Sequence, residues 1–162
     1  MKRGAPGDVF RHLVGAFPSG VTVVTAPDDG EGYWGFTASS FISVSLEPPL
    51  VLVALDAKAD CYAAFDAAEA FVVNILATGQ KDVAVRFATR GIDKFAGLST
   101  SPGKHTGGPI IDGVAAHVEC VMHERHVAGD HVLLLGLVVG GEREDVEPLL
   151  YYHRAFGRFQ TG

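Results

Sequence analysis

The hydroxyl-bearing segment GFTASSF is the first candidate for binding chemistry. Across residues 34–46 the even positions are mostly apolar and the odd ones mostly small or polar, which is typical of a strand with one apolar face. Ser40 and Phe41 break this pattern, and the strand would be unusually long, so we expect a bend or bulge near Ser39. Freed backbone N–H groups there, with the Thr37, Ser39 and Ser40 hydroxyls, could bind a phosphate or a heterocycle edge. A bulge whose hydroxyls satisfy only themselves explains the pattern equally well.

Four histidines raise the question of a metal site. Zinc sites need three or four converging ligands. His117 and His123 would share one face of a strand but lie about 20 Å apart by strand rise. His126 and His131 flank a Gly-Asp turn, where two ligands could meet without closing a site. We therefore expect no metal.

The segment GEGYWG matches the GxGxxG spacing of dinucleotide-binding turns. That fingerprint requires a following helix, whose N-terminus holds the pyrophosphate. Here the period stays at two and Pro48 and Pro49 follow, so we predict no Rossmann site. No serine lies in a GxSxG context, so nothing nominates a hydrolytic nucleophile.

Length and composition are those of a small globular protein. The 162 residues suit one domain spanning 1–162. The net charge is −6 and the 13 Lys and Arg residues are scattered, so we expect no nucleic acid partner. No apolar run approaches the ~20 residues of a membrane span, and the start MKRGAPGDVF lacks the apolar core of a signal peptide. We therefore expect no membrane partner and a cytoplasmic location, with Cys61 and Cys120 as reduced thiols.

Hydrophobic periodicity predicts six or so strands and two or three short helices. The helix at residues 8–17 has Asp8 as its expected N-cap, and the apolar run 50–55 is typical of a strand buried on both faces. The glycine-rich stretch 91–113 is expected to be a long functional loop. Together these elements favour a barrel-like β fold. Strands are expected at 21–26, 34–46, 50–55, 71–76, 115–124 and 132–139, further helices at 60–68 and 81–90, and an aromatic tail at 149–159.

Eight stretches in order along the chain carry a family resemblance. They are FPSGVTVVTA, GFTASSFISVSLEPPLVLVAL, FVVNIL, VAVRFA, DKFAG, GGPIIDGVAAHVEC, HVAGDHVLLLGLV and PLLYYHRAFGRF. In this order and spacing the chain resembles the flavin reductase family that serves two-component monooxygenases. The resemblance implies a mainly β fold, the FMN-binding split β-barrel with a few short helices. It also implies NAD(P)H-dependent reduction of FMN or FAD by hydride transfer, delivery of reduced flavin to a partner monooxygenase, and a homodimer.

The resemblance also implies which residues bind the flavin. One segment would line the ring and ribityl chain, a second would contact the phosphate from the end of a strand, and a third would lie near the phosphate or cover the flavin. A core position for Phe87 and a solvated cation for Arg86 are the alternatives. At Cys61 relatives often have serine or threonine, so its weaker donor leaves the choice between FMN and FAD open. The three segments are Thr37, Ala38, Ser39 and Ser40; Asp56, Ala57 and Lys58, with Cys61; and Arg86, Phe87, Lys94 and Phe95.

A second implied set serves the nicotinamide of NADH or NADPH. His131, in the motif Gly-Asp-His, is implied as the catalytic residue that positions the nicotinamide or stabilises charge on the reduced ring. Tyr152, His153 and Arg154 are expected beside the dinucleotide, although tail aromatics could equally form a dimer interface.

Two other functions remain open at this point. A flavin-storing or flavin-sensing protein of the same fold would bind FMN without nicotinamide turnover. A substrate-oxidising enzyme resembling the pyridoxamine phosphate oxidases would need a second basic pocket for the substrate phosphate. The arginines are dispersed along the sequence and do not indicate such a pocket.

Overall fold

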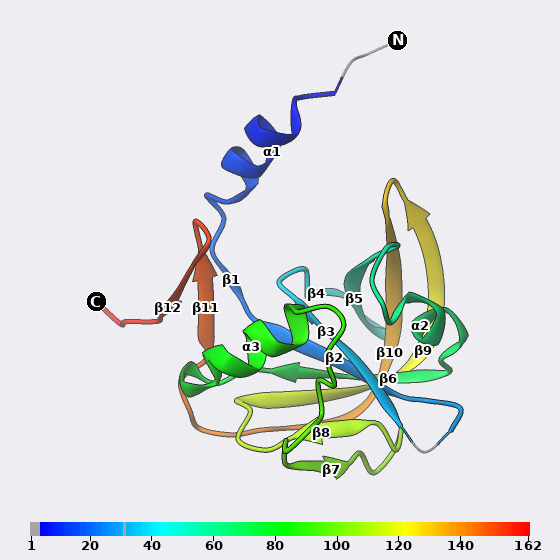
Figure 1. Cartoon of the computed structure of the whole chain (residues 1–162). Helices are drawn as coiled ribbons and strands as arrows, with labels where there is room; N and C mark the ends of the chain where they lie inside the picture. Colours follow the sequence, from blue (N-terminus) through cyan, green and yellow to red (C-terminus); the bar gives the residue numbers. More distant parts are fainter. Residues whose placement is uncertain (1–3, 31) are drawn as a thin grey trace.

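The computed structural model describes residues 4–30 and 32–162, and most of it is one antiparallel β sheet. The sheet has seven strands in the order β3-β2-β6-β9-β10-β5-β4, and it is strongly curled (Figure 1). The predicted mainly β fold is confirmed. The strands are β2 (Thr22–Pro27), β3 (Tyr33–Ala38), β4 (Ile42–Leu46), β5 (Pro49–Asp56), β6 (Ala70–Ile75), β9 (Ala116–Ala128) and β10 (His131–Arg143).

The sheet closes on itself between β3 and β5. Strands β3 and β4 lie at opposite edges of the sheet, yet only Ser39, Ser40 and Phe41 separate them along the chain. The Ala54 N–H of β5 donates a hydrogen bond to Ser40 Oγ at 2.9 Å, which links the two edges. The expected bend near Ser39 is thus confirmed, but the single long strand was wrong. At this bend the chain passes from β3, at one edge of the sheet, to β4, at the other edge. One continuous strand cannot lie at both edges, so the predicted strand is divided into two.

Strands β9 and β10 form a long hairpin that extends beyond the barrel in Figure 1. Each has 13 residues, more than the sequence pattern predicted. Register shifts between Leu135 and Gly136 and between Val138 and Gly140 bend the pair. On the other side of β10, strand β5 alternates buried and half-buried residues. The prediction of burial on both faces was therefore wrong, because only one face of β5 lies inside the closed barrel.

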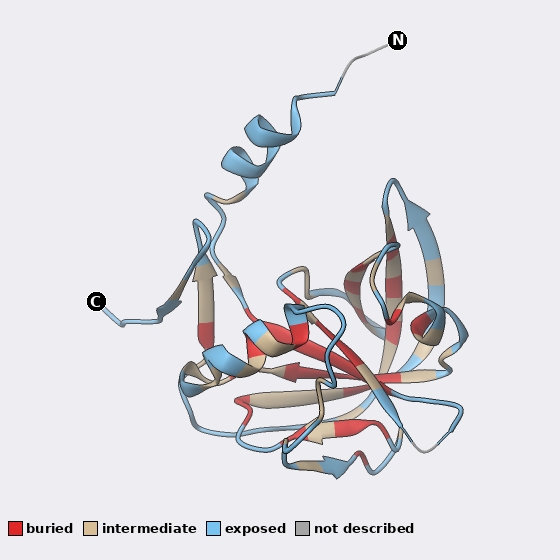
Figure 2. Ribbon diagram, viewed as in Figure 1, coloured by how far each residue is buried: buried red, intermediate tan, exposed pale blue. Residues whose placement is uncertain are grey.

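Four short helical elements accompany the strands. They are α1 (Gly7–Val14), α2 (Tyr62–Ala67), the 3₁₀ helix η1 (Thr78–Gln80) and α3 (Lys81–Ala88). Helix α3 packs on β3 and β2 and buries Ala84 and Phe87. Helix α1 exists as predicted, but its N-cap is Pro6 and Asp8 lies in the first turn. Helix α1 buries no residue and projects away from the barrel (Figure 2).

The remaining strands form two small sheets. Strands β7 (Thr100–Pro102) and β8 (Pro109–Ile111) pair as a hairpin inside the stretch that was expected to be one irregular loop, so that expectation was partly wrong. Strand β1 (Ser19–Gly20) pairs with β11 (Leu149–Tyr152), which in turn pairs with β12 (Ala155–Arg158). This second sheet carries the C-terminal hairpin to the base of α1.

The core has two parts. One fills the barrel between β2, β5, β6 and β10 and includes Phe65 and Phe71, both fully buried. The other lies under α3 and joins Phe87 to Ile111 and Leu149. Figure 2 shows in red that buried residues gather where the strands cross, with the exposed segments around them.

A buried carboxylate fastens the β7–β8 hairpin to the barrel. Glu119 of β9 is only 2% exposed. Its Oε2 accepts hydrogen bonds from the backbone N–H groups of His105 and Thr106, at 2.8 and 2.9 Å, and from the Thr106 hydroxyl at 2.9 Å. Burial raises the pKa of Glu119, but these three donors lower it by more, so the pKa lies below the usual value of a glutamate.

We predict that Glu119→Gln destabilises the protein by about 1–3 kcal/mol at pH 7, because an amide cannot satisfy three donors as an ionised carboxylate does. A lowered pKa in the folded state means that the contribution is present above the unfolded pKa of about 4.3 and is lost as pH falls through the folded pKa. Urea denaturation at neutral and acidic pH measures this difference, which should shrink as the pH falls. The exposed Glu144→Gln is the control, with little effect at either pH. An equal loss for both variants would contradict the assignment.

Candidate functional site

Two neighbouring segments at the end of the barrel bring many of the predicted flavin residues together. The turn after β5 begins at Asp56, and the segment after α3 contains Arg90 and Gly91. Arg90 forms an ion pair with Asp56 at 3.6 Å, and the Gly91 N–H donates to Asp60 at 3.0 Å. These contacts hold the segment carrying Lys94 and Phe95 next to the turn 56–61.

His131 lies at the same end of the barrel. It is the register partner of Asp56 in the β5–β10 ladder, and the Ala57 N–H donates to the Asp130 carbonyl at 3.0 Å. The His131 ring meets Asp130 through Nδ1 at 2.7 Å, which leaves Nε2 as the nitrogen that can face a ligand. This hydrogen bond lowers the pKa of Asp130. With 43% of its side chain exposed, His131 is accessible beside the exposed Lys58.

A cavity of about 370 Å³ adjoins the turn 56–61. Lys94 lies on its wall, and its ammonium donates to the carbonyls of Gly35 at 3.1 Å and Phe87 at 3.0 Å. The Phe87 carbonyl belongs to the last turn of α3, where a cation is favourable. An ammonium has three donors, so one N–H of Lys94 remains for a ligand. The cavity is lined by Tyr33, Trp34, Gly35, Asp60, Gly91, Ile92, Asp93, Lys94 and Phe95.

Aromatic contacts fix Phe95 in the same wall. Its ring packs edge-on against Phe87 at 5.1 Å and tilted against Tyr33 at 5.5 Å. Gly35 completes the packing, because a Cβ at this position would lie 2.6 Å from the Phe87 ring. Phe95 is half-buried and lines the cavity.

The segment TASSF presents fewer free groups than its sequence suggested. The Thr37 hydroxyl donates to the Ala84 carbonyl of α3, Ala38 is buried, and the Ser40 hydroxyl is bonded to Ala54. Ser39 is the exposed member. Thr37 and Ser39 line a second cavity of about 440 Å³, between α3 and the β11–β12 hairpin, together with Ala84, Val85, Ala88 and Tyr151 among others.

Two predicted contacts need correction. Cys61 and Phe87 are each 1% exposed, so both side chains are enclosed by the protein's own atoms and reach no ligand in this structure. Burial raises the pKa of the Cys61 thiol, and the enclosed side chain is not placed to contact a phosphate. For Phe87 the alternative of core packing holds. The Arg86 guanidinium, expected near the flavin, donates to the Ala96 carbonyl at 2.9 Å and supports the segment after α3.

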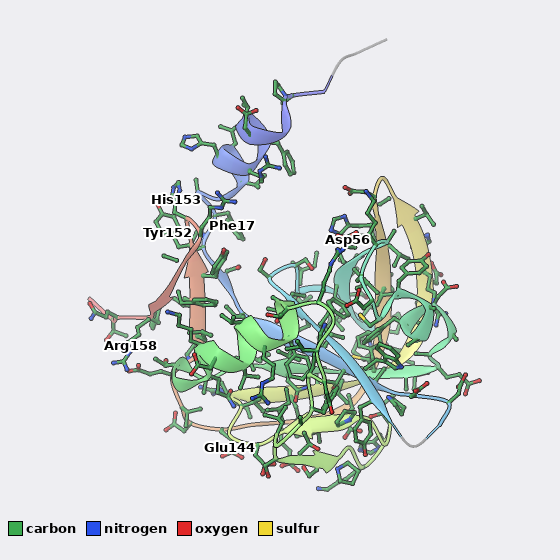
Figure 3. All side chains as sticks on the ribbon, viewed as in Figure 1. Phe17, Asp56, Glu144, Tyr152, His153 and Arg158 are labelled. Carbon is green, nitrogen blue, oxygen red and sulfur yellow. The ribbon has the colours of Figure 1, made fainter. Side chains whose placement is uncertain are left out.

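The predicted nicotinamide residues fall into two separate places. Tyr152, His153 and Arg154 lie at the turn between β11 and β12, near Phe17, whereas Asp56 and hence His131 lie across the molecule (Figure 3). The turn lines a third cavity of about 250 Å³, which includes Ser39 and Arg11 of α1. Ser39 and Tyr151 line both this cavity and the 440 Å³ cavity, so the two adjoin.

Sequence reasoning missed Arg11 and Arg90. Arg11 lies in an amphipathic helix, where a solvent-exposed arginine is ordinary. Arg90 lies at the expected end of a helix, where a cation is equally ordinary. The sequence does not show that Arg90 lies next to Asp56, because the two residues are brought together only by the fold. Among the described residues, no group of three or more His, Cys, Asp or Glu side chains is placed to hold a metal ion. No described helix is long and apolar enough to span a membrane.

Comparison with known proteins relates the chain to one family. A family model described as "Flavin reductase like domain" matches residues 14–160. The chain is 45% identical over 153 residues to the actinorhodin polyketide dimerase of Streptomyces coelicolor, covering 91% of this chain and 84% of that protein. It is 40% identical over 144 residues to the reductase subunit of a flavin-dependent monooxygenase of Rhodococcus jostii, covering 88% and 73%.

A solved structure extends the likeness to the whole fold. The NADH:FAD oxidoreductase of Streptomyces globisporus, in complex with NAD and FAD fragments, matches with a TM-score of 0.90 and 37% identity, over 99% of this chain and 98% of that chain. Two relatives from Rhizobium meliloti are longer, and this chain spans 64% and 45% of their lengths. The predicted split-barrel architecture is confirmed.

We predict that alanine substitutions at Ser39 and Ser40, which are adjacent in TASSF, change the free energy of unfolding by different amounts. Ser40→Ala leaves the part-buried Ala54 N–H without its partner and lowers the free energy of unfolding by about 1–2 kcal/mol. Ser39→Ala removes an exposed hydroxyl and changes it by less than about 0.5 kcal/mol. Urea denaturation of both variants measures the difference. Equal effects would mean that Ser40 does not close the barrel.

Proposed function

Because the chain belongs to the flavin reductase like domain family, we propose that it reduces FMN or FAD with a hydride from NADH or NADPH and delivers the reduced flavin to a partner monooxygenase. The observation that carries this proposal is the match over 99% of the chain to a reductase solved with NAD and FAD fragments. The relative named as a monooxygenase reductase subunit supports the oxygenase partner.

The residues at the end of the barrel fit a flavin. Lys58, within the turn 56–61, is an exposed cation that can neutralise a phosphate, and the ion pair of Arg90 with Asp56 lies beside it. The half-buried Phe95 and the neighbouring Trp34 offer apolar surface for a ring system. Asp56, Ala57 and the free N–H of Lys94 supply polar contacts at the same place. We propose these residues, with Ser39, as the flavin-binding set.

His131 is the proposed positioning group for the nicotinamide. A bound flavin supplies the hydride acceptor and the nicotinamide the donor, and neither needs a proton from the protein in the hydride step itself. Asp130 fixes the imidazole through Nδ1, so Nε2 is held in one direction beside Asp56. A ring held in this way can orient a substrate amide or stabilise negative charge on the reduced ring.

We predict that the protein bleaches oxidised flavin anaerobically with a reduced nicotinamide, and that His131→Ala slows this reaction by about 10-fold or more. Stopped-flow measurements should cross NADH and NADPH with FMN, FAD and riboflavin, which also identifies the preferred pair. His126→Ala is the matched control, because His126 is exposed on the same hairpin and pairs with Glu124. We expect the control variant to retain the parent rate.

The same measurement distinguishes the reductase function from the alternative of flavin storage or sensing. A yellow protein that neither nicotinamide bleaches would support flavin storage or sensing and would contradict the reductase proposal. A parent that turns over while His131→Ala matches it would contradict the role of His131 alone.

We also propose that the protein is a homodimer. Helix α1 and the residues just after it expose five large apolar side chains, Val9, Phe10, Leu13, Val14 and Phe17, with exposed fractions from 43% to 78%. Strand β4 adds Ile42, Val44 and Leu46, the last 92% exposed. Isolated exposed apolar residues are common, but a whole helix face is typical of an interface. A second copy would cover both surfaces.

We expect a mass of twice 17.1 kDa by light scattering after size-exclusion chromatography. Leu13→Glu should weaken the dimer, because a charge in an apolar interface is costly. Asp8→Glu, on the same helix, is the control. A monomeric parent protein would rule the dimer out. The cytoplasmic location and the single domain over 1–162 remain predictions.

A further inference from the structure

A fourth cavity, of about 460 Å³, lies between the β7–β8 hairpin, the start of β9 and the end of β10, and we call it the hairpin cavity. In Figure 1 this hairpin lies at the bottom of the view, whereas α1 lies at the top. None of the residues that line the hairpin cavity belongs to α1, to β4 or to the sets proposed for the flavin and the nicotinamide. The cavity is therefore separate from both the proposed active site and the proposed dimer surfaces.

Carboxylates outnumber lysines and arginines in the lining of the hairpin cavity. The lining includes four carboxylate side chains, two histidines and one lysine, Lys104, whose ammonium lies 3.1 Å from Glu142. Within residues 4–30 and 32–162, no Lys, Arg or His nitrogen lies within 4.0 Å of the other three carboxylates. Figure 3 shows one of them, Glu144, at this end of the molecule. Negative charge therefore remains for a ligand to neutralise. The four carboxylates are Asp112, Glu119, Glu142 and Glu144.

The buried Glu119 has one carboxylate oxygen without a hydrogen-bond donor. Its Oε2 accepts the three bonds from His105 and Thr106, whereas its Oε1 accepts none from the described residues. No side-chain oxygen among those residues is both sealed from solvent and unpartnered, so Oε1 is open to the cavity that Glu119 lines. Because its pKa is lowered, Glu119 is ionised at neutral pH. An ionised oxygen on a side chain that is only 2% exposed gains free energy from any donor that reaches it.

Part of the wall is apolar, and close packing holds it in place. Ile111 and Val114, which are 1% and 5% exposed, line the same cavity as the carboxylates. The loop between β7 and β8 lies tightly against the barrel, because a Cβ at Gly140 of β10 would collide with the ring of His105. A site with an apolar wall and unpaired carboxylates suits a ligand that has an alkyl chain and a cationic end.

The cation that fits this cavity is organic rather than metallic. Among the described residues no three His, Cys, Asp or Glu side chains are placed to hold a metal ion, and a metal needs several converging ligands. A guanidinium group instead binds carboxylates through charge-assisted hydrogen bonds. We propose that the hairpin cavity binds an alkyl chain ending in a guanidinium or ammonium group, with Glu119 and Glu144 as its anionic partners. The chain belongs either to a small free molecule or to an arginine or lysine of a partner protein.

Isothermal titration calorimetry of the parent protein with butylguanidine tests the site directly. Butylurea has nearly the same shape without the charge and is the matched ligand control. Butylguanidine should bind about 10-fold more tightly than butylurea, or better, because charge-assisted hydrogen bonds are the stronger kind. Added salt should weaken its binding. Equal affinities for the two ligands, or no binding of either, would overturn the proposal.

Three surface variants relate binding to the cavity. Glu144→Gln should weaken butylguanidine binding by about 5-fold or more, because one anionic partner is lost. Lys104→Gln should strengthen it by about 3-fold or more, because Lys104 no longer neutralises Glu142. Glu147→Gln is the control and should bind as the parent does, since Glu147 is exposed on the same connection but does not line the cavity. Equal losses for Glu144→Gln and Glu147→Gln, or weaker binding by Lys104→Gln, would contradict the site.

Glu119→Gln tests the buried oxygen itself. It should weaken butylguanidine binding by about 10-fold or more, measured under conditions in which urea denaturation shows the variant to be folded. Undiminished binding by the folded variant would overturn the role of Glu119. Glu144 and Lys104 are exposed, so their variants keep the test decisive if Glu119→Gln does not fold.

A short peptide distinguishes the two sources of the cation. Butylguanidine and a blocked peptide with one central arginine both bind if the cavity takes a protein side chain, whereas only butylguanidine binds if it takes a free molecule. Both results support the site. Calorimetry requires no flavin and no turnover, so its result is independent of the proposed reductase function. A protein that reduces flavin but does not bind butylguanidine would contradict the cation site alone.

Discussion

The closure of the barrel through Ser40 determines where every other part of the site lies. The Ala54 N–H bonds the Ser40 hydroxyl, and this one contact brings the edge strand β3 next to β5. Two residues further along β5, Asp56 is in register with His131 and paired with Arg90. The exposed Ser39 is left on the outside of the same bend. A barrel that closed one residue earlier or later would reverse the faces of these strands, because side chains alternate along them.

Most of the side chains that the sequence suggests as ligand contacts form hydrogen bonds within the protein instead. Thr37 is bonded to α3, Ser40 to β5, and Lys94 to two carbonyls. Buried polar groups must be paired, so hydroxyls near the core find internal partners first. The groups left for a ligand are those without such partners, notably Lys58 and Ser39.

Sequence patterns predicted what depends on neighbours along the chain. The period-two runs located most of the strands, the 3.6-residue stripes located α1 and α3, and the broken alternation located the bend at Ser39. The contacts that decide function join distant positions. Thr37 meets Ala84 across 47 residues and Lys94 meets Gly35 across 59. No local pattern encodes such pairs, so the burial of Cys61, the pairing of Glu119 and the hairpin β7–β8 were not foreseen. The family resemblance supplied the fold because it carries long-range information that periodicity lacks.

Shifted pKa values in this protein record structure more than catalysis. Burial raises the pKa of Cys120 to about 12 and that of Cys61 above its usual value, and both thiols are sealed in the core. Glu119, whose pKa is lowered, fastens a hairpin. Enzymes that move protons tune such groups within their sites. A reductase that moves a hydride needs instead to hold two rings in contact and neutralise their phosphates. The groups proposed for these tasks are the exposed Lys58 and the imidazole of His131, which Asp130 orients.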